Sequence, residues 1–234
     1  MEFGQDMFDP DEFYRRFQKF KKIDYANSFY SFWKYKVNVE AGAGHILDST
    51  HMRRTVSKLG PILRAWQAYR PFDSSVCLER LETSLGEMVS EYDLIRNISL
   101  LEFDKAPRNV LKTIWHKLGR VKEYDGKENS YSRYYVMATT KQLMFLWGQT
   151  LAFDELVRDK MPPSDYTYVR MRARNNKWTF TMWHNVMSEF QERVLEMPEF
   201  IDLCHTVCLK EFGNDEIIPY GQFIDLYYWI GAKK

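Results

Sequence analysis

Residues 9–20, with the sequence DPDEFYRRFQKF, contain the pattern that decides the fold class of this chain. Asp9 followed by a proline is a typical helix start, because the aspartate caps the first amides and proline fits the first turn. Phe13, Phe17 and Phe20 follow at steps of four and three, which place them on one face of a helix. The segment therefore predicts an amphipathic α-helix that buries this aromatic face.

The same helical spacing recurs through the rest of the chain, and long β-type alternation is nearly absent. Gly, Pro and capping residues set the limits of the further helices that we expect, at residues 25–39, 47–69 with a kink or restart at Gly60-Pro61, 74–101, 107–119, 134–147, 150–160, 177–196, 198–212 and from 219 onward. The sequence therefore predicts a mainly α fold in which residues 1–234 form a single multi-helix domain. The polar stretch 120–132 is the one place where a weak subdivision is expected.

Composition excludes several classes of protein. The chain has 234 residues with 33 Lys and Arg against 32 Asp and Glu, so a surface of a single charge sign is excluded while a local patch is not. The hydrophobic share of 45% is typical of a folded domain. No apolar run approaches the ~20 residues of a membrane span. The acidic start of the chain has no leader-like apolar region, so we expect a soluble, cytoplasmic protein with reduced cysteines.

The stretch 137–161, MATTKQLMFLWGQTLAFDELVRDKM, holds the candidate catalytic residues. Lys141 is expected near the first turn of an apolar helix, and Asp154 lies thirteen positions later among apolar neighbours. A carboxylate in such surroundings has a raised pKa unless it is paired, which is typical of a general base. A structural interpretation stays open beside this one, because Thr150 can cap a helix in which Asp154 offsets the dipole and pairs with Arg158.

The pattern T-T-K-x-L-x-x-L-x-G, followed by A-F-D-x-x-V-R, resembles the lysine-then-aspartate segment of the helix–hairpin–helix base-excision DNA glycosylase superfamily. It is closer to uncharacterised relatives of that superfamily than to its enzymes, and it covers about 25 of the 234 residues. The resemblance places residues 139–141 at a helix start, and it implies a glycosylase-like fold and DNA as the partner. It also implies cleavage of an N-glycosidic bond, with Lys141 as nucleophile or phosphate contact and Asp154 as charge-stabilising acid or base. Arg158 matches the basic residue that follows the aspartate. No Gly-x-Gly hairpin precedes Lys141, so the chain is either an active or a degenerate member.

A basic and aromatic segment follows at residues 166–178, YTYVRMRARNNKW. Arginines at every second position share one side of an extended strand, and such cations contact phosphates while aromatic rings stack on bases. We assign nucleic-acid contacts here to Arg170, Arg172, Arg174, Lys177 and Trp178, and the alternative is a solvated basic face. A smaller cationic cluster on a predicted helix is interpreted as ordinary surface and consists of His51, Arg53, Arg54, Lys58 and Arg64.

Neither a metal nor a cofactor is predicted. Cys204 and Cys208 lie four residues apart on one helical face next to His205, but no second cysteine pair completes a zinc site. We therefore interpret both thiols as core residues. Phosphate-binding loops and the common hydrolase motifs are absent from the sequence.

The expected function is nucleic-acid binding, with catalysis undecided. The alternative is a non-catalytic protein-interaction module, because Tyr227, Tyr228 and Trp229 near the C-terminus are expected to form an exposed aromatic surface. An enzyme that acts on a small molecule is a third hypothesis without a motif behind it. Self-association and protein partners are left open by the sequence.

Overall fold

Helices build the part of the chain that the structure describes. In this computed structural model the described residues are 9–23, 26–42, 44–68, 74–121, 133–153 and 179–232. They form ten α-helices and one 3₁₀ helix and contain no strand, in the order α1 (Pro10–Phe20), α2 (Ala26–Glu40), α3 (Met52–Ala65), α4 (Ser74–Glu87), α5 (Val89–Ile95), η1 (Leu100–Lys105), α6 (Arg108–Arg120), α7 (Arg133–Trp147), α10 (Phe180–Leu195), α11 (Pro198–Phe212) and α12 (Tyr220–Ala232). The predicted mainly α fold is confirmed.

The first helix begins as its sequence predicts. One carboxylate oxygen of Asp9 accepts the backbone N–H of Asp11 at 2.9 Å and that of Glu12 at 3.2 Å. Phe13 and Phe17 on the apolar face are buried. Their rings lie edge-on to the ring of Phe223 of α12, with ring centroids 5.7 and 5.8 Å apart. The cap satisfies free amides of the first turn, and the aromatic face holds α1 against α12.

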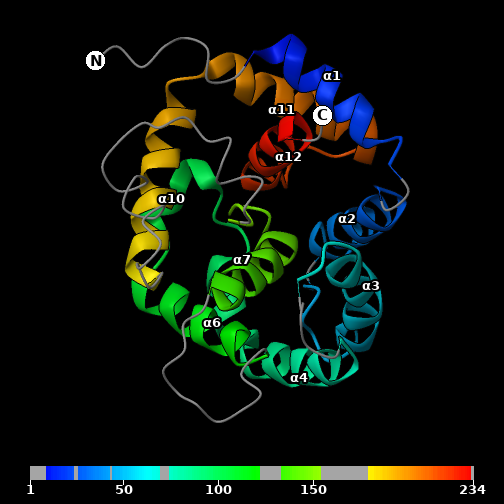
Figure 1. Cartoon of the computed structure of the whole chain (residues 1–234), viewed down its shortest axis with the longest axis vertical. Coiled ribbons are helices and arrows are strands. Elements are labelled where there is room, and N and C mark those ends of the chain that lie inside the picture. Colours follow the sequence, from blue (N-terminus) through cyan, green and yellow to red (C-terminus); the bar gives the residue numbers. More distant parts are fainter. Residues whose placement is uncertain are drawn as a thin grey trace.

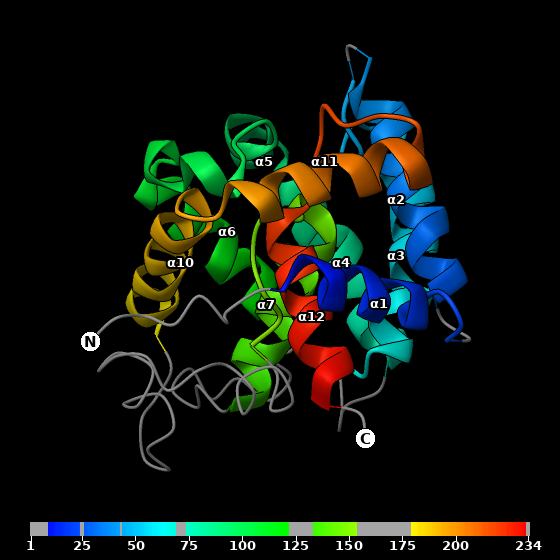
Figure 2. The ribbon, with the colours of Figure 1, turned by 90° about the horizontal axis from the view of Figure 1, so that it is seen from above.

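Two helices occupy the interior. Figure 1 shows α7 and α12 surrounded by the other helices, and Figure 2 shows the same pair between α10 on one side and α2 with α3 on the other. Residues 138–147 of α7 and 220–230 of α12 are all buried. A helix that is buried on all sides carries no polar face, so these two segments have weak amphipathic patterns in the sequence.

The end of α7 is fixed by two glycines. Gly148 has φ +84° and terminates the helix, and its N–H donates to the carbonyl of Met144 at 2.8 Å. A Cβ atom on Gly221 of α12 would lie 2.4 Å from the backbone of Gln149 and Thr150. Only a residue without a side chain therefore permits this approach of α12 to the turn at 148–150.

Several helix limits differ from the predicted ones. The expected continuous helix over 74–101 breaks at Met88, whose backbone angles of φ −108° and ψ 11° end α4 before α5 begins. The helix does not restart at Gly60-Pro61, because α3 continues through this proline. Residues 150–153 are not helical, so the helix predicted from Thr150 does not start there, and residues 154–160 lie outside the described part.

The predicted aromatic surface near the C-terminus is wrong. Tyr227, Tyr228 and Trp229 are exposed by only 8%, 4% and 6%. The ring of Trp229 stacks on that of Trp66 with centroids 5.0 Å apart, and the guanidinium of Arg16 lies 4.0 Å from the centre of the Tyr227 ring. These rings pack between α12 and its neighbours. They therefore do not form the exposed surface on which the expectation of a protein partner was based.

The helices on the two sides of the predicted subdivision pack together. The side-chain amide of Gln142 on α7 donates to the carbonyl of Leu118 on α6 at 3.3 Å. Leu118 and Gln142 are both fully buried. Residues 122–132 themselves lie outside the described part of the chain.

Candidate functional site

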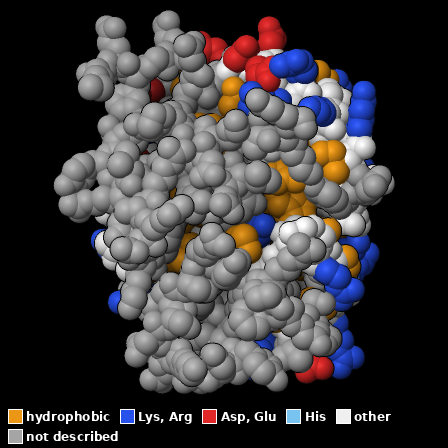
Figure 3. All heavy atoms as spheres, in the orientation of Figure 1, with side chains coloured by type: hydrophobic (Ala, Val, Ile, Leu, Met, Phe, Trp, Pro, Cys, Tyr) orange, Lys and Arg blue, Asp and Glu red, His pale blue; other side chains and the backbone are white. Residues whose placement is uncertain are grey.

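A hollow of about 500 Å³ lies on the surface between α2 and α3. We call it the α2–α3 hollow, and its lining residues are Ser31, Lys34, Tyr35, Asn38, Val39, Arg54 and Lys58. Three of these side chains are cationic and none is a carboxylate. Figure 3 shows Lys and Arg side chains along the right-hand edge of the molecule, where Figure 1 places α2 and α3.

Helical spacing brings these side chains together. Ser31, Lys34 and Asn38 recur at steps of three and four on α2, and Arg54 and Lys58 are four apart on α3. Residues at these steps share one face of a helix. Because α2 and α3 pack side by side, the two rows of side chains meet across the hollow.

The ring of Tyr35 lies beneath two of the three cations of the hollow, Arg54 and Lys58. Its hydroxyl oxygen lies 3.2 Å from the carbonyl oxygen of His51 and 3.0 Å from the hydroxyl of Thr55, which holds the ring between the helices. The guanidinium carbon of Arg54 is 5.1 Å from the ring centre, and the ammonium of Lys58 is 5.8 Å from it. A cation over an aromatic face is stabilised by the negative potential of that face, so the ring helps to position both cations.

The cations of the α2–α3 hollow have no carboxylate partner in the part of the chain that the structure describes. The ammonium of Lys58 donates to the hydroxyl of Ser31 at 2.8 Å, and neither Lys34 nor Arg54 forms an ion pair with a described acid. No Asp or Glu occurs in the sequence between Asp48 and Asp73, and the only acid of α2 is the buried Glu40. Among the described residues, no carboxylate therefore neutralises the positive charge of the hollow.

Some surface cations outside the hollow are paired with described acids. Lys21 contacts Glu211 at 2.8 Å, and Lys117 contacts Glu91 at 2.7 Å. Burial is the largest single effect on the pKa of Glu91 and raises it, but the ammonium of Lys117 and the hydrogen bonds of the carboxyl together lower this pKa below its usual value. In a chain with a net charge of +1, the α2–α3 hollow is thus a local excess of positive charge.

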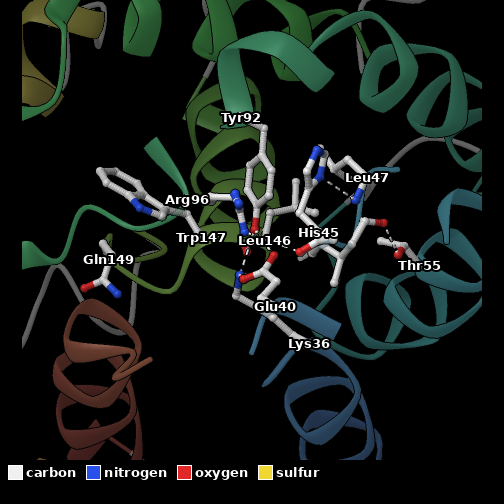
Figure 4. Close-up of polar contacts among 12 residues, drawn as sticks. Lys36, Glu40, His45, Leu47, Thr55, Tyr92, Arg96, Leu146, Trp147 and Gln149 are labelled. Carbon is white, nitrogen blue, oxygen red and sulfur yellow. Dashed lines mark hydrogen bonds and ion pairs between the residues drawn. The ribbon is translucent and has the colours of Figure 1, made fainter. Parts of the chain in front are cut away.

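The opposite face of α2 carries a buried polar network, which Figure 4 shows. The ammonium of Lys36 donates to the carboxylate of Glu40 and to the hydroxyl oxygen of Tyr92, the latter at 2.7 Å. The hydroxyl of Tyr92 lies 2.8 Å from Glu40 Oε1 and 2.9 Å from the carbonyl oxygen of Leu146. The network therefore links α2 to α5 and α7.

Burial governs the charges in this network. It lowers the pKa of Lys36, an effect that the adjacent carboxylate of Glu40 opposes, and it raises the pKa of Tyr92 well above its usual value. Lys36 and Tyr92 have no exposed surface and Glu40 is buried too, so no ligand reaches them from solvent. The network stabilises one arrangement of three helices and is not a binding site.

A second hollow of about 500 Å³ lies beside the network, over α5 and the turn before α3. Three carboxylates and one arginine line it: Arg96 Nε lies 2.9 Å from Asp93, and His45 Nε2 lies 3.0 Å from Asp48, while Glu87 is the third acid. The N–H of Leu47 donates to His45 Nδ1 at 3.2 Å, which leaves Nε2 as the nitrogen that carries the proton of the neutral ring. This hollow is acidic overall, so it suits an anion less well than the α2–α3 hollow does.

Lys141 lies in the middle of α7, not near its start. The helix begins at Arg133, so the expectation that residues 139–141 open a helix is wrong. The side chain is 4% exposed, and its ammonium donates to the carbonyl of Trp66 at 2.6 Å. The hydroxyl oxygen of the neighbouring Thr140 lies 2.8 Å from the carbonyl oxygen of Val136 and also contacts that of Ala152, so it can donate to either.

The remaining predicted site residues lie outside the part of the chain that the structure describes. They are Asp154, Arg158, Arg170, Arg172, Arg174, Lys177 and Trp178. Their predicted roles as catalytic acid and nucleic-acid contacts stay predictions.

One buried acid next to the predicted catalytic segment escaped the sequence analysis. Asp225 on α12 is fully buried, and its carboxylate accepts the N–H of Ala152 at 2.7 Å. Thr140 therefore contacts the carbonyl oxygen of Ala152 and Asp225 accepts its N–H, two residues before Asp154. Asp225 is the single acid within the apolar stretch 223–230, and this pattern in the sequence could have identified it as a buried carboxylate.

Cys204 and Cys208 are buried free thiols, and burial raises the pKa of each. The adjacent His205 lies 3.0 Å from the carboxylate of Asp215 and 3.2 Å from the hydroxyl of Tyr220. Within the described ranges, no three or more His, Cys, Asp or Glu side chains gather as metal ligands.

No known protein family, curated protein or solved structure matches this chain. The described helices include none with the length and hydrophobicity that a membrane span requires. The geometry of the described residues is therefore the basis for any functional assignment.

Proposed function

We propose that this protein binds nucleic acid and that the α2–α3 hollow contacts its phosphates. The observation that supports this proposal is the convergence of Lys34, Arg54 and Lys58, without a described carboxylate partner, on one hollow. Lys and Arg supply most of the phosphate contacts that position proteins on nucleic acids. The basic segment 166–178 is proposed as a second contact region on the basis of its sequence.

Contacts in the α2–α3 hollow are proposed to be independent of base sequence. The face of Tyr35 is covered by Arg54 and Lys58, and its hydroxyl is engaged with α3, so the ring offers no free surface on which a base could stack. Base-edge contacts read the sequence, whereas stacking on an aromatic ring tolerates any base. The cations alone favour recognition of phosphate groups, which carry no sequence information.

Within the resemblance to helix–hairpin–helix glycosylases, we propose a catalytically degenerate member. Lys141 carries a buried ammonium that donates to a main-chain carbonyl, which disfavours its role as a nucleophile toward an extruded nucleotide. The same proposal expects no release of damaged bases from DNA duplexes. Cleavage that disappears in Asp154→Asn would restore the enzymatic hypothesis.

The test of binding is fluorescence anisotropy with labelled single- and double-stranded oligonucleotides at several salt concentrations. The triple variant Lys34→Ala, Arg54→Ala, Lys58→Ala is compared with Arg15→Ala, Lys105→Ala, Arg120→Ala, whose cations are exposed and paired with acids. Both variants remove three positive charges, so they have the same net charge.

The hollow variant is expected to lose at least about ten-fold in affinity, and its salt dependence is expected to flatten. Each lost phosphate contact reduces the slope of log affinity against log salt by about 0.9 on a duplex and about 0.7 on a single strand. The control variant should keep most of the wild-type slope. Equal losses in both variants, or no binding by the wild type, would contradict the proposal.

A further inference from the structure

The cations of the α2–α3 hollow surround one space and are not arranged in a row. Lys34 approaches it from α2, whereas Arg54 and Lys58 approach from α3, around a volume of about 500 Å³. A surface that follows a strand of nucleic acid spaces its cations along the backbone, one near each phosphate. Three cations around one hollow are suited to a single, highly charged group.

The chemistry of phosphates distinguishes two candidates for that group. An internal phosphodiester carries one negative charge and two non-bridging oxygens. A terminal phosphate monoester carries a charge of about −1.5 to −2 at neutral pH and offers three strong acceptor oxygens. Three cations without a described carboxylate partner complement the terminal group better.

The donors of the hollow are sufficient for such a group. After Lys58 donates to Ser31, its ammonium keeps two further N–H groups, and Lys34 and Arg54 add three and five donors. The hydroxyl of Ser31 and the side-chain amide of Asn38 line the same space. A volume of about 500 Å³ is within the common range for ligand sites, about 300–1,000 Å³, and leaves room for the terminal sugar.

We infer that the α2–α3 hollow binds the terminal phosphate monoester of a nucleic-acid strand. This inference rests on the proposed function and makes it more specific, because it assigns Lys34, Arg54 and Lys58 to a strand end instead of the internal backbone.

The experiment compares oligonucleotides of one sequence that carry either a phosphate or a hydroxyl at each end. Affinities for the full chain are measured by competition against a labelled phosphate-ended strand. Inorganic phosphate and a mononucleotide serve as further competitors. The hollow triple variant and the control triple variant described above are measured in parallel.

A phosphate on one end is expected to raise wild-type affinity about ten-fold or more. The hollow variant should lose this difference, and the control variant should keep it. The preference should also shrink below about pH 6, where the monoester gains a proton.

Three outcomes would overturn the inference. Equal affinities for phosphate and hydroxyl ends would remove it while leaving the proposed nucleic-acid binding intact. Inorganic phosphate that competes as well as the phosphate-ended strand would show a general anion site. Absence of binding to every strand would contradict the proposed function as well.

Discussion

Lys34 and Lys36 lie two residues apart on α2, yet their surroundings are opposite. Lys36 is fully buried and contacts Glu40 and Tyr92, whereas Lys34 is exposed and has no described acid beside it. A buried ammonium loses its hydration and needs compensating partners, but an exposed one keeps its water and needs none. The comparison separates charges that maintain the fold from charges that remain available to a ligand.

The largest expected effect is on the buried side of α2. Lys36→Met should lower the free energy of unfolding by about 3–5 kcal/mol, because it leaves the carboxylate of Glu40 buried without its cation. Urea denaturation followed by tryptophan fluorescence measures the loss. Lys34→Met is the matched control on the same helix, and equal losses in the two variants would contradict the distinction between the two faces. The double variant Lys36→Met, Glu40→Leu should regain much of the stability.

Tyr92→Phe tests the third member of the network. The substitution removes a hydroxyl that contacts Lys36, Glu40 and the carbonyl of Leu146, and it should cost about 1–3 kcal/mol at neutral pH. Its effect should be smaller than that of Lys36→Met, because no charge is left without its counter-ion. Thermal or urea unfolding of the two variants side by side decides their order.

Alkaline pH sharpens the same comparison. The pKa of Tyr92 is raised by burial from its ordinary value of 10.0, so above about pH 10 the folded chain keeps a proton that the unfolded chain releases. Stability due to this group is fully present below pH 10 and decreases as the pH rises further. The wild type should lose stability more steeply than Tyr92→Phe, by about 1.4 kcal/mol per pH unit. Parallel pH profiles of the two proteins above pH 10 would contradict the assigned burial.

The smallest expected effect on stability is in the α2–α3 hollow. Arg54→Ala should change the free energy of unfolding by no more than about 0.5 kcal/mol, because Arg54 is exposed, forms no described ion pair and contacts the Tyr35 ring from the surface. Its effect should instead be seen in nucleic-acid affinity. A loss of several kcal/mol in urea denaturation would show that this cation serves the fold.

Local periodicity was enough to predict the fold class and most of the helices. The cap at Asp9 and the aromatic face of α1 follow from the residue types and their spacing, which act within one helix. Prediction was wrong where a segment is apolar on all sides. In α12 the pattern could not show that Tyr227 and Trp229 face neighbouring helices instead of solvent.

The candidate site was only partly predictable. Arg54 and Lys58 were recognised as a cationic cluster but were interpreted as ordinary surface, and Lys34 was not associated with them because it belongs to another helix. Their closeness depends on the packing of α2 against α3. The absence of acids between Asp48 and Asp73 was the local signal that could have identified the patch.

By itself, the sequence determined that this chain forms helices and where many of them begin, because capping and periodicity are interactions between near neighbours. The tertiary structure decided which charges are buried, which are compensated and which converge. Lys34 and Lys36 are the same residue type on the same helix, and only the side that faces α5 and α7 receives a carboxylate and a tyrosine hydroxyl. Desolvation depends on neighbours that are distant in the sequence, so the fates of the two lysines could not be read from their own segment.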